Sequence, residues 1–179
     1  MTKLHLGCGS RNFGDDWIHI DASNYPHISS HSLTELPFSN KSVDLIYASH
    51  VIEYFDYNEA FSVLKEWKRV LRSAGILRVA VPDFRAIADL YLRNAFPIKS
   101  FIGPLYGKMK VNDVYLYHKI AFDFDSLSNL LIDVGFTNVR VYDWRKTEHS
   151  FFDDHSQAYL PHMDKETGTL ISLNVECTN

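Results

Sequence analysis

The segment Leu4-His5-Leu6-Gly7-Cys8-Gly9 decides the fold class, because it joins an apolar strand directly to a turn with two glycines. Glycine has no Cβ, so a ligand can lie against the backbone of such a turn. Asp21 ends the next predicted strand, residues 17–20. In doubly wound sheets, ligands bind beyond the carboxyl ends of the strands, where an acid can accept hydrogen bonds from both hydroxyls of a ribose. Together the two features predict a nucleoside site.

The glycine turn does not match the fingerprint of dinucleotide-binding proteins. That pattern requires Gly-x-Gly-x-x-Gly before a helix that faces a pyrophosphate. Here Asn12 takes the place of the third glycine, and Gly14 comes two residues late. The 11 residues between Gly9 and Asp21 also leave little room for a full crossover helix. We therefore expect a reduced first crossover and a nucleoside without phosphates.

Apolar, β-branched runs alternate with stretches of helical period along the rest of the chain, which indicates an α/β fold with a mostly parallel sheet. Gly75 is expected to end the first helix, Asp125 to cap the third and Gly135 to follow it. The predicted helices are residues 58–71, 83–94 and 126–134. The predicted strands are residues 3–6, 17–20, 28–33, 43–48, 76–81, 138–143 and 169–176.

Residues 96–124 interrupt this alternation with two prolines, two glycines, four lysines and three tyrosines. Long irregular segments in compact domains usually have a function or are disordered, and the aromatic residues argue against disorder. We therefore expect residues 1–179 to form one domain, with residues 96–124 as an inserted, lid-like segment.

Composition narrows the class of protein. The chain has 179 residues, of which 46% are hydrophobic and 22% are charged, which is enough apolar material for one ordinary core. Lysine and arginine total 18 against 22 acids, a net charge of −4, so no overall positive field attracts nucleic acid. No apolar run is long enough for a membrane span and the amino terminus has no signal-like stretch, so we expect a cytoplasmic protein. Cys8 and Cys177 are too few for a disulfide framework.

Seven short motifs occur in a fixed order: LHLGCG, WIHID, LPF, SVDLIY, SHVIEY, RVL and LRVAVPD. In this order they resemble the small class I S-adenosylmethionine-dependent methyltransferases, and most of all a compact branch often linked to bacterial surface-polysaccharide genes. The resemblance covers residues 3–84 and, more weakly, residues 118–143. It implies a Rossmann-like fold with a seven-stranded, mostly parallel sheet whose last strand is antiparallel. It also implies S-adenosylmethionine as the cofactor.

The resemblance carries cofactor roles onto particular residues. Gly7 to Gly9 would pass beneath the methionine part, Asp21 would hold the ribose hydroxyls, and Ala22 would line the adenine. The family commonly has an acid at the adenine where this chain has His31 and Ser32. The implied cofactor-binding residues are Gly7, Cys8, Gly9, Asp21, Ala22, Ser32, Leu33, Ala48, Ser49 and His50.

Methyl transfer to a hydroxyl would require a base, and a histidine is the natural base at neutral pH. His50, which follows the fourth strand, is the first candidate for the catalytic base, and His118 is the second. Either histidine can instead be structural, with His50 holding a loop and His118 anchoring the lid. Glu53 is more simply explained as a cap or charge at the start of the next segment, although it could also approach the ammonium group of the cofactor. The expected acceptor is a small molecule, a saccharide or nucleotide-sugar hydroxyl, although an amine would need no base.

Two other functions fit parts of the sequence. The chain could bind S-adenosylmethionine without turnover, as a regulatory or assembly subunit, or it could be a nicotinamide-dependent oxidoreductase, against which Asn12 and the short crossover argue. Ligand-type side chains also cluster near the carboxyl terminus, but their spacing matches no tight metal pattern, so no metal is expected. These side chains are His149, Asp153, Asp154, His155, His162 and Asp164.

Overall fold

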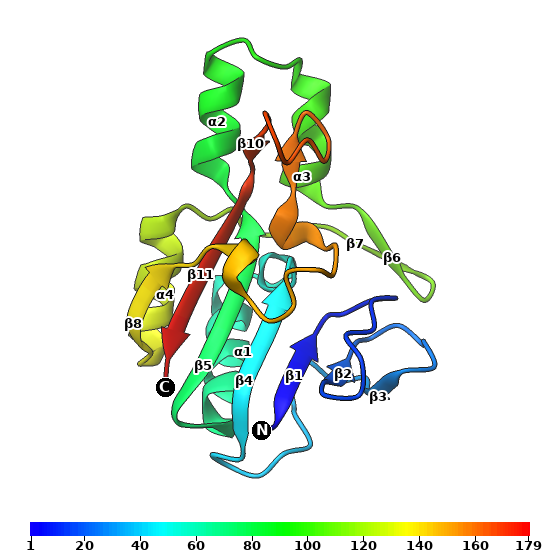
Figure 1. Ribbon diagram of the computed structural model, residues 1–179, viewed down its shortest axis with the longest axis vertical. Coiled ribbons are helices and arrows are strands. Elements are labelled where there is room, and N and C mark those ends of the chain that lie inside the picture. The colour runs from blue at the N-terminus through cyan, green and yellow to red at the C-terminus, as the bar shows by residue number, and fades with distance from the viewer.

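The main sheet has seven strands in the order β3-β2-β1-β4-β5-β11-β8 (Figure 1). The computed structural model describes residues 1–179. All neighbouring strands run parallel except β11, which is antiparallel to both β5 and β8. The strands are β1 (Lys3–Leu6), β2 (Ile18–Ile20), β3 (Ile28–Ser30), β4 (Val43–Ser49), β5 (Leu71–Pro82), β8 (Thr137–Val141) and β11 (Ser172–Thr178). The predicted fold class, including the antiparallel last strand, is confirmed.

Capping residues fix where the helices begin. The side chain of Asp56 accepts a hydrogen bond from Glu59 N, and the Glu59 side chain returns one to Asp56, which makes a capping box before α1. The α-helices are α1 (Tyr57–Val70), α2 (Phe84–Leu92), α3 (Ile102–Tyr106) and α4 (Phe124–Val134). The 3-10 turns are η1 (Ile52–Tyr54), η2 (Ile98–Phe101), η3 (Trp144–Lys146) and η4 (His155–Gln157). None of these helices is long and apolar enough to cross a membrane.

Two predicted helix boundaries are wrong. Asp123, and not Asp125, caps α4, because its carboxylate accepts from Ser126 N at 2.9 Å while Asp125 lies in the first turn. Gly75 does not end α1, because the helix stops at Val70 and leads directly into β5. Gly75 lies inside β5, where a Cβ would come within 2.9 Å of Arg72 O. The glycine therefore allows a tight backbone approach within the strand.

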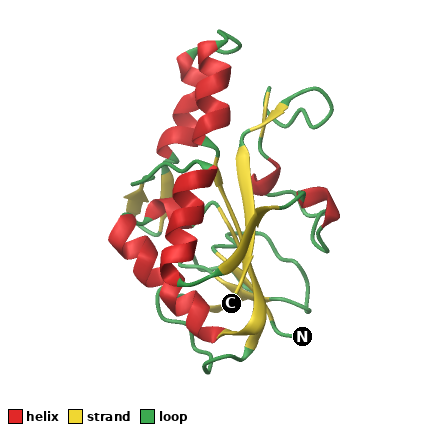
Figure 2. Cartoon of the chain, turned by 90° about the vertical axis from the view of Figure 1, so that its left-hand side faces the viewer, coloured by secondary structure: helices red, strands yellow, loops and turns green.

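The two faces of the sheet are covered differently. Figure 2 shows the α-helices on one side of the sheet, and loops with short helical turns on the other. Leu4 and Leu6 belong to the 27-residue apolar core on the helical side. His5, which lies between them in β1, stacks on Phe13 of the first crossover, with ring centroids 4.0 Å apart. The first crossover contains no helix, as its length predicts.

The segment between β5 and α4 is folded and not irregular. It contains α2, η2, α3 and a small hairpin of β6 (Met109–Val111) and β7 (Val114–Leu116). Figure 1 shows α2 and α3 side by side, extending beyond the carboxyl ends of the parallel strands. Near the other end of the chain, β9 (Tyr159–Leu160) pairs with β10 (Thr169–Leu170). The predicted strand at 169–176 is therefore divided between β10 and β11.

Candidate functional site

The glycine turn after β1 contains two residues with positive φ angles. Gly7 and Gly9 have φ angles of 65° and 57°, in the left-handed region that favours glycine. A Cβ on Gly7 would lie 2.2 Å from Cγ2 of Val51, so this glycine lets the loop after β4 pack closely. A Cβ on Gly9 would have nothing within 4 Å. The backbone at Gly9 therefore leaves open space against which a ligand can lie.

Asp21 lies beside this turn at the carboxyl end of β2. Its Oδ2 accepts a hydrogen bond from Gly9 N at 2.8 Å, and its Oδ1 accepts one from Ser23 N at 2.7 Å. These bonds fix the carboxylate, which is only 8% exposed. A carboxylate can accept about four hydrogen bonds, so each oxygen still has a free lone pair. Those lone pairs can accept from the two hydroxyls of a ribose.

The residues assigned to the adenine have mixed surroundings. Ala22 is exposed, and Ser32 Oγ accepts from Glu35 N at 3.0 Å. Leu33 packs against the main core, and its carbonyl oxygen accepts from Trp67 Nε1 at 2.9 Å. His31 Nδ1 donates to Asp21 O at 3.0 Å, since a carbonyl oxygen can only accept. His31 is therefore the residue of this group that directly contacts the predicted ribose acid.

Cys8, at the centre of the glycine turn, is buried and remains a thiol. Its Sγ lies 3.9 Å from His27 Nε2. Burial, and next the neighbouring charge of Asp21, raise the pKa of Cys8 to about 12. The side chain therefore acts as a small packing residue of the turn and not as a nucleophile.

The end of β4 supplies an unpaired polar group. Ala48 and Ser49 are both buried, and Ser49 Oγ has no hydrogen-bond partner within the protein. An unsatisfied buried hydroxyl is costly, so such a group is often paired with a ligand. The anchored Asp21 carboxylate, the open Gly9 backbone and the Ser49 hydroxyl therefore fit a polar nucleoside cofactor at this edge of the sheet.

His50 follows β4 with a φ angle of 55°, in the left-handed region. Its Nε2 lies 3.2 Å from Ser172 Oγ at the start of β11, and its ring centroid lies 5.3 Å from that of His155. Burial lowers the pKa of His50 well below its ordinary value, and the neighbouring His155 and His118 act in the same direction. The imidazole is therefore neutral at physiological pH, which a base requires.

Glu53 is not the exposed charge that its place before a helix suggests. Its carboxylate is buried, and neither oxygen has a hydrogen-bond partner. Its Oε1 lies 3.4 Å from His50 Nδ1 and 3.7 Å from His118 Nε2. Burial raises the pKa of Glu53 to about 8. The two candidate bases, 68 residues apart in the sequence, are thus brought together on one carboxyl group.

The predicted lid-like segment is attached directly to this group. Lys119 N donates to Glu53 O at 2.8 Å, and Tyr54 Oη donates to Gly107 O at 2.7 Å. His118 packs so closely on Gly107 that a Cβ there would lie 1.8 Å from His118 Nε2. A cavity of only about 10 Å³ is left between this segment and Pro82. His118 therefore joins the segment to the site and also anchors it.

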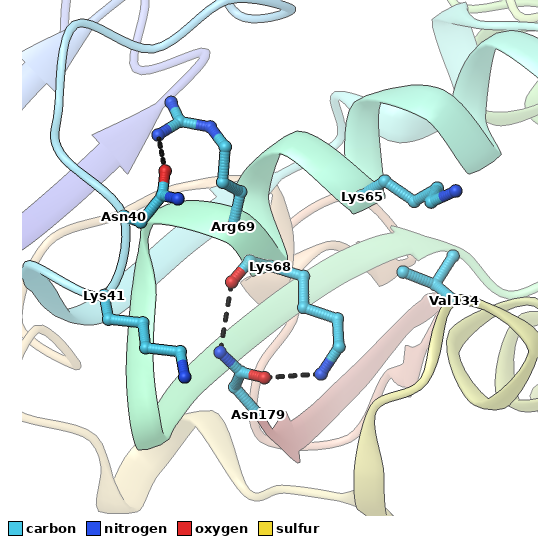
Figure 3. Close-up of a pocket in the computed structure, with 7 residues that line it drawn as sticks. All are labelled: Asn40, Lys41, Lys65, Lys68, Arg69, Val134 and Asn179. Carbon is cyan, nitrogen blue, oxygen red and sulfur yellow. Dashed lines mark hydrogen bonds between the residues drawn. The ribbon is translucent and has the colours of Figure 1, made fainter.

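A larger cavity, of about 330 Å³, lies elsewhere and is not the cofactor site (Figure 3). Lys41 precedes β4, Lys68 is near the end of α1, and Asn179 follows β11, so the cavity is at the amino ends of the parallel strands. Lys68 Nζ donates to Asn179 Oδ1, and Asn179 Nδ2 donates to Lys68 O. The seven lining residues are Asn40, Lys41, Lys65, Lys68, Arg69, Val134 and Asn179.

The aspartates among the ligand-type side chains near the carboxyl terminus have hydrogen-bond or ion-pair partners. Asp154 accepts from Ser156 N and from Tyr47 Oη, while Asp153 pairs with Lys165. His149 is buried among aromatic rings. No group of three or more histidine, cysteine, aspartate or glutamate side chains in the structure is arranged to hold a metal ion.

Three members of the site were not predicted, and of these only His155 was noted in the sequence, as a ligand-type side chain near the carboxyl terminus. Ser172 contacts His50, Asn174 accepts from Ser172 Oγ at 3.0 Å, and His155 lies beside the His50 ring. They come from β11 and η4, more than 100 residues after His50. The pairing of β11 with β5 places Ser172 and Asn174 near the end of β4, and the hydrogen bond from Asn174 Nδ2 to Ser156 O holds η4 there.

Comparisons with known proteins match this chain to methyltransferases. Residues 15–79 match the family model described as a methyltransferase domain. A probable S-adenosylmethionine-dependent methyltransferase in each of two Mycobacterium tuberculosis strains, CDC 1551 and H37Rv, is 30% identical over 119 residues. The match covers 65% of this chain and 36% of each relative. The chain thus spans about a third of the length of these relatives.

Solved structures extend the likeness to the whole chain. A methyltransferase of this cofactor class from Methanosarcina mazei has a TM-score of 0.60 at 16% identity, and the match covers 99% of this chain and 92% of that one. A Burkholderia thailandensis 1,6-didemethyltoxoflavin N1-methyltransferase, solved with S-adenosylhomocysteine bound, has a TM-score of 0.57 at 12% identity, covering 99% and 70%. The chain therefore has the fold of the class I S-adenosylmethionine-dependent methyltransferases.

Proposed function

We propose that this chain is an S-adenosylmethionine-dependent methyltransferase that acts on a small polar acceptor. The observation that carries the proposal is Asp21, whose carboxylate is fixed at the end of β2 by Gly9 N and Ser23 N. This anchoring directs an acid to the place where a nucleoside sugar would lie beside the open backbone of Gly9. The fold and the family match of residues 15–79 support the same activity.

Particular residues would hold the cofactor and the reacting groups. Gly7 to Gly9 would contact the methionine part, Asp21 the ribose, and Ser49 a polar group near the end of β4. The cofactor would supply a methyl group on a positively charged sulfur, which is already a good leaving group. The protein would therefore mainly orient the acceptor and exclude water. A proton from an acceptor hydroxyl would pass to the histidines, His50 or His118.

The acceptor that we propose is a hydroxyl of a saccharide or of a nucleotide-linked sugar. Residues 84–119 contain six lysines and arginines against two aspartates, although the whole chain has a net charge of −4. In this segment Lys108 Nζ lies 4.5 Å from the centre of the Tyr115 ring, and Tyr115 is exposed. A positive, aromatic surface suits a sugar that carries phosphate groups. It offers less to an amine acceptor, which would be cationic.

The segment of residues 96–124 is proposed to act as the lid over this acceptor. It meets the site through His118 and Lys119, and it contributes Lys108, just before β6, and Tyr115 of β7. Such a lid would exclude water from the reacting groups. A saccharide that protects the amides of this segment from hydrogen exchange, or that can be crosslinked to Tyr115 or Lys108, would support this arrangement.

The test of the cofactor is binding by calorimetry and thermal shift with S-adenosylmethionine, S-adenosylhomocysteine and NADH. We expect the first two to raise the melting temperature, because a ligand of the folded state stabilises it. Asp21→Ala should weaken cofactor binding by about 1 to 3 kcal/mol, since the ribose hydroxyls lose their acceptor. Asp16→Ala, which removes an exposed acid of the same crossover, is the matched control.

Three outcomes would contradict the proposal. A response to NADH alone would favour an oxidoreductase. An unchanged affinity in Asp21→Ala would remove the observation on which the proposal depends. Tight binding of S-adenosylmethionine with no transfer of labelled methyl to any nucleotide sugar or free saccharide would favour a non-catalytic binding subunit.

A further inference from the structure

The hydrogen-bond network at β11 determines the protonation of His50. Asn174 Nδ2 donates to Ser156 O at 2.9 Å, so the amide oxygen of Asn174 faces Ser172. Ser172 Oγ must then use its proton to donate to Asn174 Oδ1, at 3.0 Å. The remaining contact of Ser172 Oγ, 3.2 Å from His50 Nε2, requires that Nε2 donates. In neutral His50 the unprotonated nitrogen is therefore Nδ1, which faces Glu53.

The lid fixes His118 in the same way from the opposite side. His118 Nδ1 lies 3.2 Å from Pro104 O, and a carbonyl oxygen can only accept. Nδ1 therefore carries the proton, and the unprotonated nitrogen of neutral His118 is Nε2. That atom lies 3.7 Å from Glu53 Oε1. The unprotonated nitrogens of both histidines thus lie near the same carboxyl oxygen, Glu53 Oε1.

Three acceptor atoms that converge in a buried space repel one another unless a proton lies among them. We propose that Glu53 is a positioning residue whose carboxyl group carries this proton in the resting protein. The carboxyl group donates a hydrogen bond to one imidazole, and the other imidazole remains free to act as the base. This inference rests on the proposed methyltransferase function and adds a role for Glu53 to it. It also explains why no group of the protein donates a hydrogen bond to the Glu53 carboxyl group.

The charged and titratable groups around Glu53 are consistent with a neutral carboxyl. It faces His50 and Tyr54 from its own loop and His118 from the lid, while His155 and Arg11 act on the cluster from further away. Burial raises the pKa of Glu53 to about 8 and lowers the pKa values of both His50 and His118. The raised pKa of Glu53 and the lowered pKa values of the two histidines both favour the proton on Glu53.

The proposed step is balanced with one proton already on Glu53. The acceptor oxygen forms a bond to the methyl carbon while the carbon–sulfur bond breaks and leaves its electron pair on sulfur. The hydroxyl proton passes to the unprotonated nitrogen of the imidazole that does not accept the hydrogen bond from Glu53. The products are a methyl ether, the neutral thioether and one imidazolium, which returns its proton to solvent after product release.

The experiment is 15N NMR of the imidazole rings in the ligand-free protein, comparing the wild type with Glu53→Gln and Glu53→Met. We expect His50 to be protonated at Nε2 and His118 at Nδ1. In the wild type, the 15N chemical shifts of both rings should change with pH, with a midpoint near pH 8 as Glu53 titrates. This pH-dependent change should be absent from Glu53→Gln and retained in Glu166→Gln, which alters an exposed glutamate. A retained change in Glu53→Gln, or the opposite form of either histidine, would overturn the inference.

Turnover gives a second readout. Glutamine can still donate to one imidazole, whereas methionine fills the space without a donor. We therefore expect turnover to fall about tenfold further in Glu53→Met than in Glu53→Gln, with the same KM for the cofactor. Equal losses in the two variants would count against Glu53. If no methyl transfer is found in any form, the proposed function fails, and the NMR result still decides the role of Glu53.

Discussion

The two faces of the sheet are covered by different kinds of side chains. On the helical face, α1 and α4 cover the strands with a continuous apolar core of 27 buried residues. On the loop face, the largest apolar cluster contains only four buried residues, Phe13, Trp17, Leu45 and Tyr47. Histidines and hydrogen-bonded polar groups fill the space between them, including His5, His19, His149 and Asp154.

This contrast shows that the two faces draw their stability from different interactions. The helical face supplies burial of apolar surface, which is the main favourable term in folding. The loop face is built from the first crossover and from residues 142–158, whose backbone must be fixed by specific contacts. The loop face should therefore depend more on pH and on single hydrogen bonds than the helical face does.

The largest effect should come from the helical face. Trp67 of α1 is fully buried, and its Nε1 donates to Leu33 O. Trp67→Ala should lower the free energy of unfolding by about 3 to 5 kcal/mol, because it leaves a cavity and an unpaired carbonyl. Urea denaturation measures this change.

Tyr57→Ala, at an exposed position on the same helix, is the matched control and should change the free energy of unfolding by less than about 0.5 kcal/mol. A loss at Trp67 as small as that of the control would mean that the helical face is not the main source of stability.

The loop face should be the acid-sensitive one. Burial lowers the pKa of His149 to about 4, whereas the unfolded chain has an ordinary histidine pKa of about 6.5. The unfolded state then binds the proton first. The contribution of His149 to stability is therefore fully present above pH 6.5 and is lost as the pH falls toward 4. The loss from this residue is of the order of 3 kcal/mol at most.

His149→Phe keeps an aromatic ring beside Phe13 and removes the titration, so the stability of this variant should fall less between pH 6.5 and pH 4. His162→Phe, at an exposed position, serves as the control. Chemical denaturation at several pH values compares them. If both variants lose stability as steeply as the wild type, His149 does not contribute to the acid sensitivity.

The smallest effect separates two tyrosines on the loop face. Tyr47 Oη donates to Asp154, whereas Tyr142 Oη is buried without a hydrogen-bond partner. Tyr47→Phe should cost about 1 to 3 kcal/mol because Asp154 loses its donor, while Tyr142→Phe should be neutral or slightly stabilising. Thermal melts of the two variants under the same conditions test the difference. Equal costs would show that single hydrogen bonds do not decide the stability of this face.

Most of the architecture was predictable because it depends on local patterns. The apolar strands, the amphipathic spacing of α1 and the short crossover before Asp21 each act within a few residues. The errors occurred where the same residue type is compatible with two different structures or positions. Asp123 and Asp125 are both good caps, and a glycine such as Gly75 suits the end of a helix and a tight point in a strand equally well.

The candidate site was predictable only in part, for the same reason. Gly9 and Asp21 lie close in the sequence, and their geometry follows from two adjacent strands. The group around Glu53 depends on contacts of long sequence separation, since His118 comes from the lid and Ser172 from β11. A glutamate before a helix gives no local sign that it will be buried between two imidazoles.

The outer strands of the sheet affect how the protein behaves at high concentration. β3 has three residues and β8 has five, and Asn138 in β8 has a φ angle of 53°, which distorts that edge. A short or distorted border offers few free backbone groups in the straight row that another chain needs to add a strand. The short β3 and the distorted β8 therefore protect the molecule from strand-to-strand aggregation.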